Sequence, residues 1–236
     1  YYKKQNAGKH TALNYAHPYI KGELVCIVDS DDWLIPEAVQ QVMDAWEKYA
    51  IYENIKCLTF LKGKSSHEPL QNDFPTEPII SNHIEFRINA DRRADCCEVL
   101  VTDVLKEHPF PEYEGERFLG EGYLWMYVGF RYDTVYINKV IYICEYLEGG
   151  LSKSGRKLRI QCPIGGMANS NAFFEIVPNR KVSMKILCKK VWLFICYGKF
   201  AGLNYHQIVE RCRRKDLVKK HYLFGVLLYI FWKYKY

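Results

Sequence analysis

The first part of the chain alternates between short apolar runs and one clearly amphipathic segment. Apolar runs at 24–28, 55–60 and 97–101 predict strands, and the apolar spacing over 36–49 predicts a helix between the first two. The run at 24–28 has no polar interruption, which is typical of a central parallel strand covered on both faces. We therefore expect an α/β fold with a mostly parallel sheet and flanking helices.

The segments around the middle of the chain are less regular. Residues 62–82 are polar, contain three prolines and predict an irregular excursion or a hairpin over the sheet edge. Residues 135–146 predict two short strands on either side of a tight turn at Asn138-Lys139. The glycine pair 149–150 and the stretch 152–155 predict a flexible, basic break.

The last third has a different pattern. Residues 182–200 and 204–214 each predict a basic helix with one apolar face. The final segment, 221–236, is apolar and aromatic between flanking lysines, and its apolar run is shorter than the ~20 residues that cross a bilayer. Such flanks favour a helix lying in the membrane interface. The alternative is a buried C-terminal helix packed on the domain.

Charge is distributed unevenly along the 236 residues, 49% of which are hydrophobic. Residues 1–150 hold 15 Lys and Arg against 24 Asp and Glu, a net of −9, whereas residues 151–236 hold 18 against 3, a net of +15. This asymmetry predicts a domain over 1–150 and a basic, aromatic-rich helical extension over 151–236. The extension suits an anionic membrane, and since it has no recognisable nucleic-acid motif, no nucleic-acid partner is expected.

The nine cysteines are scattered and include no C-x-x-C pair. We expect neither a zinc site nor a disulfide framework, and a reducing, cytoplasmic location.

Three carboxylates, Asp29, Asp31 and Asp32, follow directly after the apolar run at 24–28. In open α/β sheets ligands collect at the carboxyl ends of such strands, and neighbouring like charges call for a cation. Aspartate oxygens suit Mg²⁺ or Mn²⁺, particularly where phosphate oxygens complete the shell. The alternative is an acidic turn that caps the next helix through Ser30 or Asp32.

Two further places carry candidate chemistry. Gly8 and Lys9 lie in a loop that leads into a short helix, where they can approach a phosphate group, although a solvated lysine is the alternative. Glu121 precedes an apolar helix, between two glycines that leave room for a substrate and beside Tyr123 and Trp125, whose rings can stack on a sugar. Glu121 is either a general base or a charge that complements the helix dipole.

Several of these segments carry a family resemblance. In order and spacing, QNAGKHTALN at 5–14, KGE at 21–23 and VDSDD at 28–32 resemble the family 2 (GT-A) glycosyltransferases. Further on, the chain is similar to the bacterial branch that builds surface polysaccharides, through FLGEGYLW at 118–125, YIN at 136–138 and YLEGGL at 146–151. The resemblance covers about residues 3–160.

The resemblance implies a GT-A fold and an inverting transfer from a nucleotide-diphosphate sugar, with a UDP-sugar as the expected donor. The acceptor would be a hydroxyl of a glycan or of a lipid-linked glycan at the inner face of the plasma membrane. On the family's pattern Asp31 ligates Mn²⁺ or Mg²⁺, Asp29 and Asp32 support the metal or the ribose, and Gly8 and Lys9 lie against the nucleotide.

Two departures from the family pattern bear on activity. Glu121 takes the first place of the family's Glu-Asp pair and Gly122 takes the second, so either Glu121 is the base or the base lies elsewhere. The resemblance places Asp95 on the acceptor side, with Tyr123 and Trp125. The chain also begins after the family's first strand, turn and helix, which implies that the first βαβ unit is missing and donor binding is weakened. A catalytically inactive nucleotide-sugar-binding or assembly subunit is the alternative function.

Overall fold

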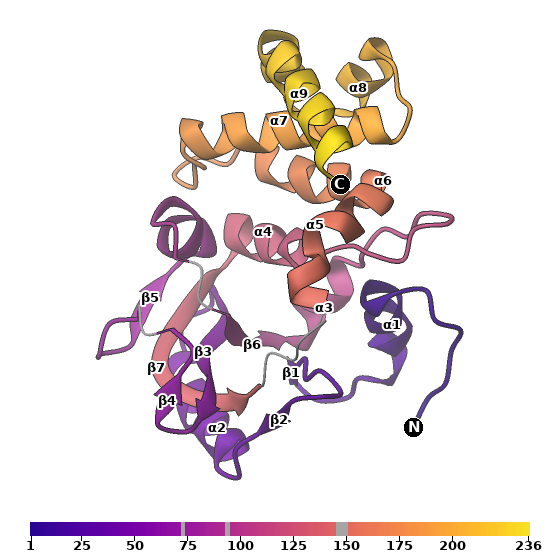
Figure 1. Cartoon of the computed structure of the whole chain (residues 1–236). Coiled ribbons are helices and arrows are strands. Elements are labelled where there is room, and N and C mark those ends of the chain that lie inside the picture. Colours follow the sequence, from indigo (N-terminus) through magenta and orange to yellow (C-terminus); the bar gives the residue numbers. More distant parts are fainter. Residues whose placement is uncertain (72–73, 93–94, 145–150) are drawn as a thin grey trace. The chain divides into compact units, whose positions relative to one another are not determined.

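The chain is divided between two units in the computed structural model, which describes residues 1–71, 74–92, 95–144 and 151–236, without the side chains of 151–154. The helical unit consists of Tyr1–Pro18, Pro109–Tyr127 and Gly149–Tyr236, and the sheet unit consists of Tyr19–His108 and Val128–Glu148. Figure 1 shows the strands of the sheet unit and, in orange and yellow, the last helices of the helical unit. The expected functional division at residue 150 stays a prediction.

The described strands of the sheet unit form one mixed sheet. Their bounds are Leu24–Cys26 (β1), Trp33–Leu34 (β2), Ile55–Ser65 (β3), Glu68–Pro69 (β4), Ile79–Ser81 (β5), Cys96–Val101 (β6) and Asp133–Ile143 (β7). The order across the sheet is β1-β6-β3-β7-β2, with β4 paired to β3 and β5 paired to β7. Among these described strands β3 and β7 run parallel, and the other pairs are antiparallel.

The expected α/β fold is therefore confirmed, but the expectation of a mostly parallel sheet with a buried central strand at 24–28 is wrong. β1 is the edge strand of the described sheet; Leu24, Val25 and Cys26 are half-buried and Val28 is exposed. The physical reason is that an apolar run indicates burial of its side chains. It does not indicate whether the neighbouring strand runs parallel or antiparallel. Here the neighbour is β6, which returns antiparallel to β1.

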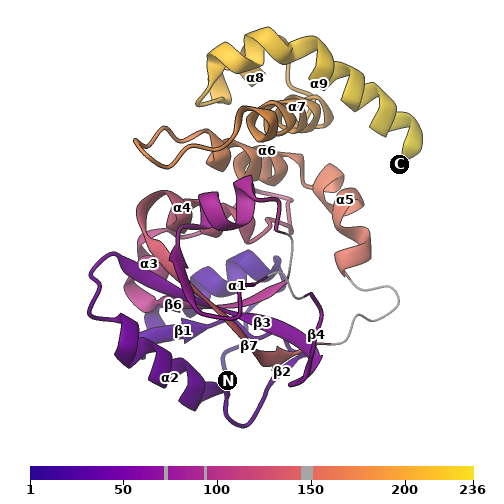
Figure 2. The same ribbon diagram turned by 90° about the vertical axis from the view of Figure 1, so that its left-hand side faces the viewer.

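Apolar side chains cover both faces of the sheet. Val135 and Ile137 of β7 belong to one cluster, whereas Tyr136 between them belongs to another, as alternation along a strand requires. The helix Ala38–Tyr49 (α2) packs on the first cluster through Trp46 and appears beside the strands in Figure 2. On the second, the ring of Phe86 stacks on Tyr136 with centroids 3.9 Å apart. A short helix, Thr102–Glu107 (α3), follows β6 directly.

The segment 135–146 is a correction to the sequence-based expectation. It does not form two strands around a turn: β7 runs continuously from Asp133 to Ile143. Phe60 pairs with Ile137 and Leu61 with Val140, so Asn138 and Lys139 form an irregularity in an otherwise continuous ladder. Pairing along β3, which no local sequence signal indicates, keeps the strand continuous through this polar pair. In the 62–82 excursion, β3 and β4 make the expected hairpin.

The described part of the helical unit contains one helix near the N-terminus and several after residue 150. Their bounds are Lys9–Ala16 (α1), Leu151–Gln161 (α5), Pro163–Asn171 (α6), Met184–Phe200 (α7), Tyr205–Arg211 (α8) and Lys215–Lys235 (α9). The helix Gly122–Arg131 (α4) contributes residues to both units. The expected break at 152–155 is wrong, because these residues continue α5, while the glycine pair 149–150 lies outside the described residues.

The helices of this unit are held by buried apolar contacts and by one well-defined cap. α7 lies between α6 and α9 and buries Val191, Phe194 and Ile195 (Figure 2). Asn204 and Gln207 form a reciprocal capping box at the start of α8. Within the part of the chain that the structure describes, no helix is both long enough and apolar enough to span a bilayer.

Candidate functional site

The three aspartates lie on a loop of the sheet unit that connects β1 to β2. The N–H of Asp32 donates to the carbonyl oxygen of Asp29 at 3.1 Å, which closes a tight turn. The following helix α2 begins at Ala38 with Glu37 at its N-cap, so neither Ser30 nor Asp32 caps it. The alternative interpretation of the aspartates as a helix cap is therefore wrong.

A tyrosine from a distant strand fixes the shape of this acidic turn. The hydroxyl of Tyr142, on β7, donates to Oδ2 of Asp32 at 2.7 Å and accepts from the N–H of Asp29 at 3.0 Å. Burial raises the pKa of Tyr142, and the hydrogen bond to Asp32 adds to the rise. Asp29 and Asp32 are half-buried, whereas Asp31 is exposed. Tyr142 therefore supports the backbone and one carboxylate of the turn while Asp31 faces solvent.

Asp95, which precedes β6, and the aspartates of the acidic turn act on the same thiol, that of Cys144. Burial raises the pKa of the Cys144 thiol, the ammonium of Lys62 opposes the rise, and the carboxylates of Asp32, Asp95 and Asp29 reinforce it. The structure thus brings the expected acceptor-side residue Asp95 into the region of the expected donor-side aspartates. Lys62 is a positive charge in this acidic region.

The donor set of the turn fits a hard divalent cation. Among the described residues, no group of three or more His, Cys, Asp or Glu side chains is arranged to hold a metal ion by itself. Mg²⁺ is usually held by one or two carboxylates together with substrate phosphates. Asp31, with Asp29 beside it on the turn, provides carboxylates of that kind, so the residues present suit a cation that arrives with a diphosphate.

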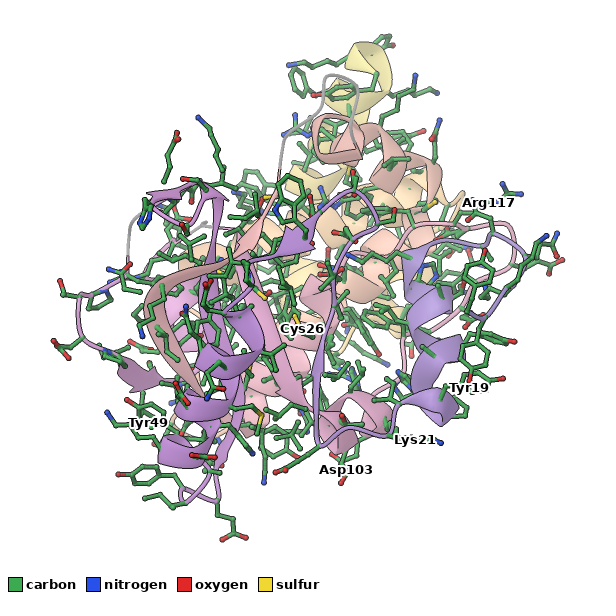
Figure 3. The ribbon with its side chains drawn as sticks, turned by 90° about the horizontal axis from the view of Figure 1, so that it is seen from below. Tyr19, Lys21, Cys26, Tyr49, Asp103 and Arg117 are labelled. Atoms are coloured by element: carbon green, nitrogen blue, oxygen red, sulfur yellow. The ribbon has the colours of Figure 1, made fainter. Side chains whose placement is uncertain are left out.

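In the helical unit, Gly8 begins helix α1 in a conformation that only glycine adopts easily. Its φ is 99°, and a Cβ built on it would lie 2.0 Å from the carbonyl oxygen of Arg117, which is labelled in Figure 3. The hydroxyl of Thr11 donates to the carbonyl oxygen of Gly8 at 2.9 Å. The backbone of the Gly8-Lys9 loop is therefore packed directly against the 109–118 loop.

Lys9 and Glu121 form an ion pair within the helical unit. Lys9 Nζ lies 2.6 Å from Glu121 Oε1, with 42% and 32% of the two side chains exposed. The carbonyl oxygen of Glu121 accepts the first hydrogen bonds of α4, so Glu121 stands at the N-terminus of that helix as expected. A pair this exposed contributes at most about 1 kcal/mol to stability, so its importance lies in holding the lysine and the carboxylate in one place.

The two glycines beside Glu121 do not border open space. Nδ2 of Asn169, on α6, donates to the carbonyl oxygen of Gly120 at 3.0 Å. A Cβ on Gly122 would meet that nitrogen at 3.5 Å, an ordinary contact, so a side chain is sterically possible there. Tyr123 packs toward Phe110, with ring centroids 6.1 Å apart, and burial raises its pKa. Trp125 is about 200° further round α4, so the two rings face different directions.

Comparison with known proteins finds one family model that matches the first part of the chain. Residues 1–94 match the sequence model described as glycosyl transferase family 2. This segment is therefore similar in sequence to the family 2 glycosyltransferases. The family 2 segment includes α1 with Gly8 and Lys9, the acidic turn, and β3.

A solved structure shares the fold of this chain. The crystal structure of S. aureus TarS 1–349 in complex with UDP-GlcNAc matches 97% of this chain and 71% of its own, with 14% identity and a TM-score of 0.54. A second structure of S. aureus TarS 1–349 covers 97% and 70%, with 13% identity and a TM-score of 0.49. No curated protein matches the chain in sequence. The expected GT-A fold is confirmed, and the missing first unit stays a prediction.

Two residues beside the acidic turn were not found by sequence reasoning. Tyr142 lies in an apolar strand pattern, where its only signal is that a buried tyrosine hydroxyl needs a partner. Lys62 was assigned to a polar excursion, and nothing in its local sequence links it to Asp32. Nζ of Lys62 lies 4.0 Å from the ring centroid of Tyr142. The family-like segment at 146–151 lies outside the described residues, except Leu151 at the start of α5.

Proposed function

We propose that the protein transfers a sugar, with inversion, from a nucleotide-diphosphate sugar to a hydroxyl of a glycan or lipid-linked glycan in surface polysaccharide synthesis. The observation that carries the proposal is the acidic turn braced by Tyr142 within a family 2 sequence segment. UDP-GlcNAc is bound by the S. aureus TarS structure of the same fold, which supports a UDP-sugar as the donor.

The donor side is assigned to the acidic turn and to Gly8 and Lys9, on the pattern of the family resemblance. Asp31 would hold Mn²⁺ or Mg²⁺, and Asp29 and Asp32 would support the metal or the ribose. When bound, the cation supplies positive charge that stabilises the departing nucleoside diphosphate. Gly8 and Lys9 would lie against the nucleotide, since the packed backbone of Gly8 and the ammonium of Lys9 suit a phosphate group.

The acceptor side is assigned to Glu121, with Tyr123, Trp125 and Asp95 lining it. In this proposal Glu121 takes the proton from the acceptor hydroxyl, whose oxygen attacks the anomeric carbon as the bond to the diphosphate oxygen breaks. Lys9 Nζ, 2.6 Å from Oε1 of Glu121, holds this carboxylate in place. Attack from the face opposite the leaving group produces inversion.

Donor hydrolysis and transfer test the role of Glu121. With a UDP-sugar and Mn²⁺, Glu121→Gln is expected to reduce kcat by about 100-fold or more, because general base catalysis contributes 10²–10⁴-fold. Glu114→Gln is the matched control, since Glu114 is exposed on the same loop. Equal rates for wild type and Glu121→Gln would leave Glu121 as a helix-end charge and refute its role as base.

Calorimetry with UDP and Mn²⁺ tests the donor side separately. Asp31→Asn is expected to weaken metal-dependent UDP binding at least about tenfold, because one charged ligand is lost. Asp103→Asn is the matched control, because Asp103 is an exposed carboxylate on α3 (Figure 3). Equal affinities for wild type and Asp31→Asn would refute the role of Asp31 as a metal ligand.

A second function is favoured by two features beside and at Glu121. The partner position Gly122 carries no carboxylate, and the carboxylate of Glu121 is engaged by Lys9. Both features suit a catalytically inactive nucleotide-sugar-binding or assembly subunit. Gly122→Asp separates the two functions, because Asn169 leaves room for a Cβ at that position. A chain that binds UDP, shows no turnover, and gains turnover on Gly122→Asp is an inactive subunit.

We also propose a cytoplasmic location at the inner face of the plasma membrane. A lipid-linked acceptor would lie at that surface, and the net charge of +15 over 151–236 suits its anionic lipids. No nucleic-acid partner is proposed.

A further inference from the structure

Helix α9 presents a continuous apolar stripe to solvent. Its large exposed side chains are Leu223, Phe224, Leu227, Ile230, Phe231 and Tyr234. At about 100° per residue, these six positions fall within roughly 120° of the helix circumference. Contiguous exposed apolar patches mark interaction surfaces, whereas apolar residues scattered singly over a surface are ordinary.

The side of α9 opposite the stripe packs on α7. Gly225 and Trp232 are buried on that opposite side. A Cβ on Gly225 would lie 2.4 Å from Cβ of Ile195, which shows that the two helices approach closely. The ring of Trp232 packs edge-on against Tyr197, with centroids 5.9 Å apart. α9 is therefore packed on the domain along one side, as the alternative expected, and exposed along the other (Figure 2).

Positive charges flank the stripe and no negative charge interrupts it. Lys219 and Lys220 precede it, Lys233 and Lys235 border its far end, and there is no Asp or Glu between residues 217 and 236. The one acid of the helix, Asp216, is held by the Arg214 guanidinium through two hydrogen bonds of 2.9 and 2.8 Å. The surface is therefore apolar along its centre and cationic at its edges.

We propose that this face of α9 binds the surface of an anionic lipid bilayer, with the helix axis parallel to the membrane plane. The inference deepens the proposed function, since it rests on that function for the membrane location and assigns the contact to one helix face. A bilayer interface accepts an apolar stripe to a depth of several ångströms, and lysines at the edges reach anionic headgroups. Because the stripe runs along the helix and the other side is packed on α7, α9 lies flat on the surface.

Charge argues against a second copy of the chain as the occupant of this face. Each stripe has lysines at both of its ends. If two α9 helices packed stripe to stripe, parallel or antiparallel, the lysines of one helix would therefore lie against the lysines of the other. Without an interleaved carboxylate, such pairs repel each other. An anionic lipid surface has the complementary charge.

Vesicle flotation of the full chain tests the proposal. The chain is expected to float with phosphatidylcholine vesicles that contain about 30% phosphatidylglycerol and to bind pure phosphatidylcholine more weakly. Leu223→Glu with Leu227→Glu should reduce the bound-to-free ratio at least about tenfold, and the milder pair Leu223→Ser with Leu227→Ser should reduce it as well. Val39→Glu is the matched control, since Val39 and Leu223 are both helical and both 67% exposed.

Lysine substitutions test the electrostatic part independently. Lys219→Gln with Lys220→Gln should weaken binding to the anionic vesicles by about fivefold per lysine and leave binding to neutral vesicles unchanged. Circular dichroism spectra that match wild type show that the variants fold. Equal flotation of wild type and both leucine pairs overturns the assignment to α9. Dimerisation that Leu223→Glu abolishes, without any vesicle binding, also overturns it in favour of a second copy.

The failure of this inference is distinguishable from failure of the proposed function. Hydrolysis of a UDP-sugar without vesicles should be the same for wild type and the leucine variants, because α9 takes no part in the chemistry. Hydrolysis without flotation refutes the membrane surface alone. Flotation without hydrolysis refutes the proposed enzyme and leaves the membrane surface standing.

Discussion

At the scale of single residues, Tyr142 connects the sheet to the acidic turn. Its hydroxyl contacts the backbone of Asp29 and the carboxylate of Asp32, while its ring lies beneath Lys62. One side chain thereby limits how far the loop between β1 and β2 can move. A turn that is held in place before the donor arrives loses less conformational entropy when it binds.

Tyr142→Phe is expected to weaken UDP binding in the presence of Mn²⁺ several-fold. The substitution keeps the ring but removes two hydrogen bonds, which costs about 1–3 kcal/mol of unfolding free energy in total. Calorimetry gives the affinity and urea denaturation gives the stability. Tyr136→Phe is the control, because Tyr136 is buried in the same strand with its hydroxyl near Thr134 and Arg87. Equal losses of affinity for both variants would contradict a role of Tyr142 at the turn.

Gly8→Ala is expected to lower the free energy of unfolding by about 2–4 kcal/mol. The φ of 99° and the contact of the new Cβ with the Arg117 carbonyl both oppose a side chain. Gly115→Ala is the matched control, since Gly115 has a φ of 77° but no atom within 4 Å of its Cβ position. Urea denaturation of the two variants separates backbone strain from the clash. The same loss for both would show that the Arg117 contact is unimportant.

At the scale of elements, the close approach of α7 and α9 depends on a small residue. Gly225→Ala is expected to destabilise the chain by about 1–3 kcal/mol, because the new Cβ would lie 2.4 Å from Cβ of Ile195. Gly155→Ala should instead stabilise it by up to about 1 kcal/mol, since it is also helical and its nearest neighbour is the flexible end of Arg159 at 3.4 Å.

Thermal denaturation of the two glycine variants is the measurement. A midpoint for Gly225→Ala equal to or above that of Gly155→Ala would contradict the tight packing of α9 on α7. A lowered midpoint together with lost vesicle binding would show that the packing also keeps the apolar stripe in place.

At the scale of the whole molecule, stability should fall in mild acid because of a half-buried histidine. Desolvation, together with the charge of Arg87, lowers the pKa of His83 to about 3. The unfolded chain therefore binds a proton below pH 6.5 that the folded chain rejects until about pH 3. The contribution of His83 is complete above pH 6.5 and decreases as the pH falls, reaching a loss of about 2 kcal/mol at pH 5.

Urea denaturation at pH 7 and pH 5 measures this effect. The midpoint for wild type should be lower at pH 5, and His83→Gln should reduce the difference. His67→Gln, at an exposed histidine, should leave the difference unchanged. A wild-type midpoint that does not move between the two pH values would contradict the prediction. The lowered pKa of His10, which is buried, acts in the same direction.

The sequence could predict those parts of the fold that depend on local patterns. The helix at 36–49 begins two residues later than expected and ends at the same residue, and the strand expected at 97–101 differs from β6 by one residue. The long helices of the last third were also expected. Glu121 was correctly placed before α4, because an acidic residue ahead of an apolar helical pattern is a local signal.

The candidate site residues stay predictions, and their contacts could not be predicted from the sequence. The order and spacing of the segments around Gly8, Lys9 and Asp29–Asp32 were enough to indicate the family resemblance, because a sequence motif can be read without knowing its contacts in the fold. The ion pair of Lys9 with Glu121 could not be predicted, since it joins residues more than 100 positions apart. The room expected beside Glu121 was also incorrect, because Asn169 of α6 lies against both glycines.

The sequence alone determined the α/β class, the cluster of three aspartates, the family resemblance, and the concentration of positive charge in the last third. These properties follow from residue type and local spacing. Only the tertiary structure decided the antiparallel neighbour of β1, the bracing of the turn by Tyr142, and which face of α9 is exposed. Each of these depends on which distant segments pack together, and that is decided by the burial of apolar surface over the whole chain.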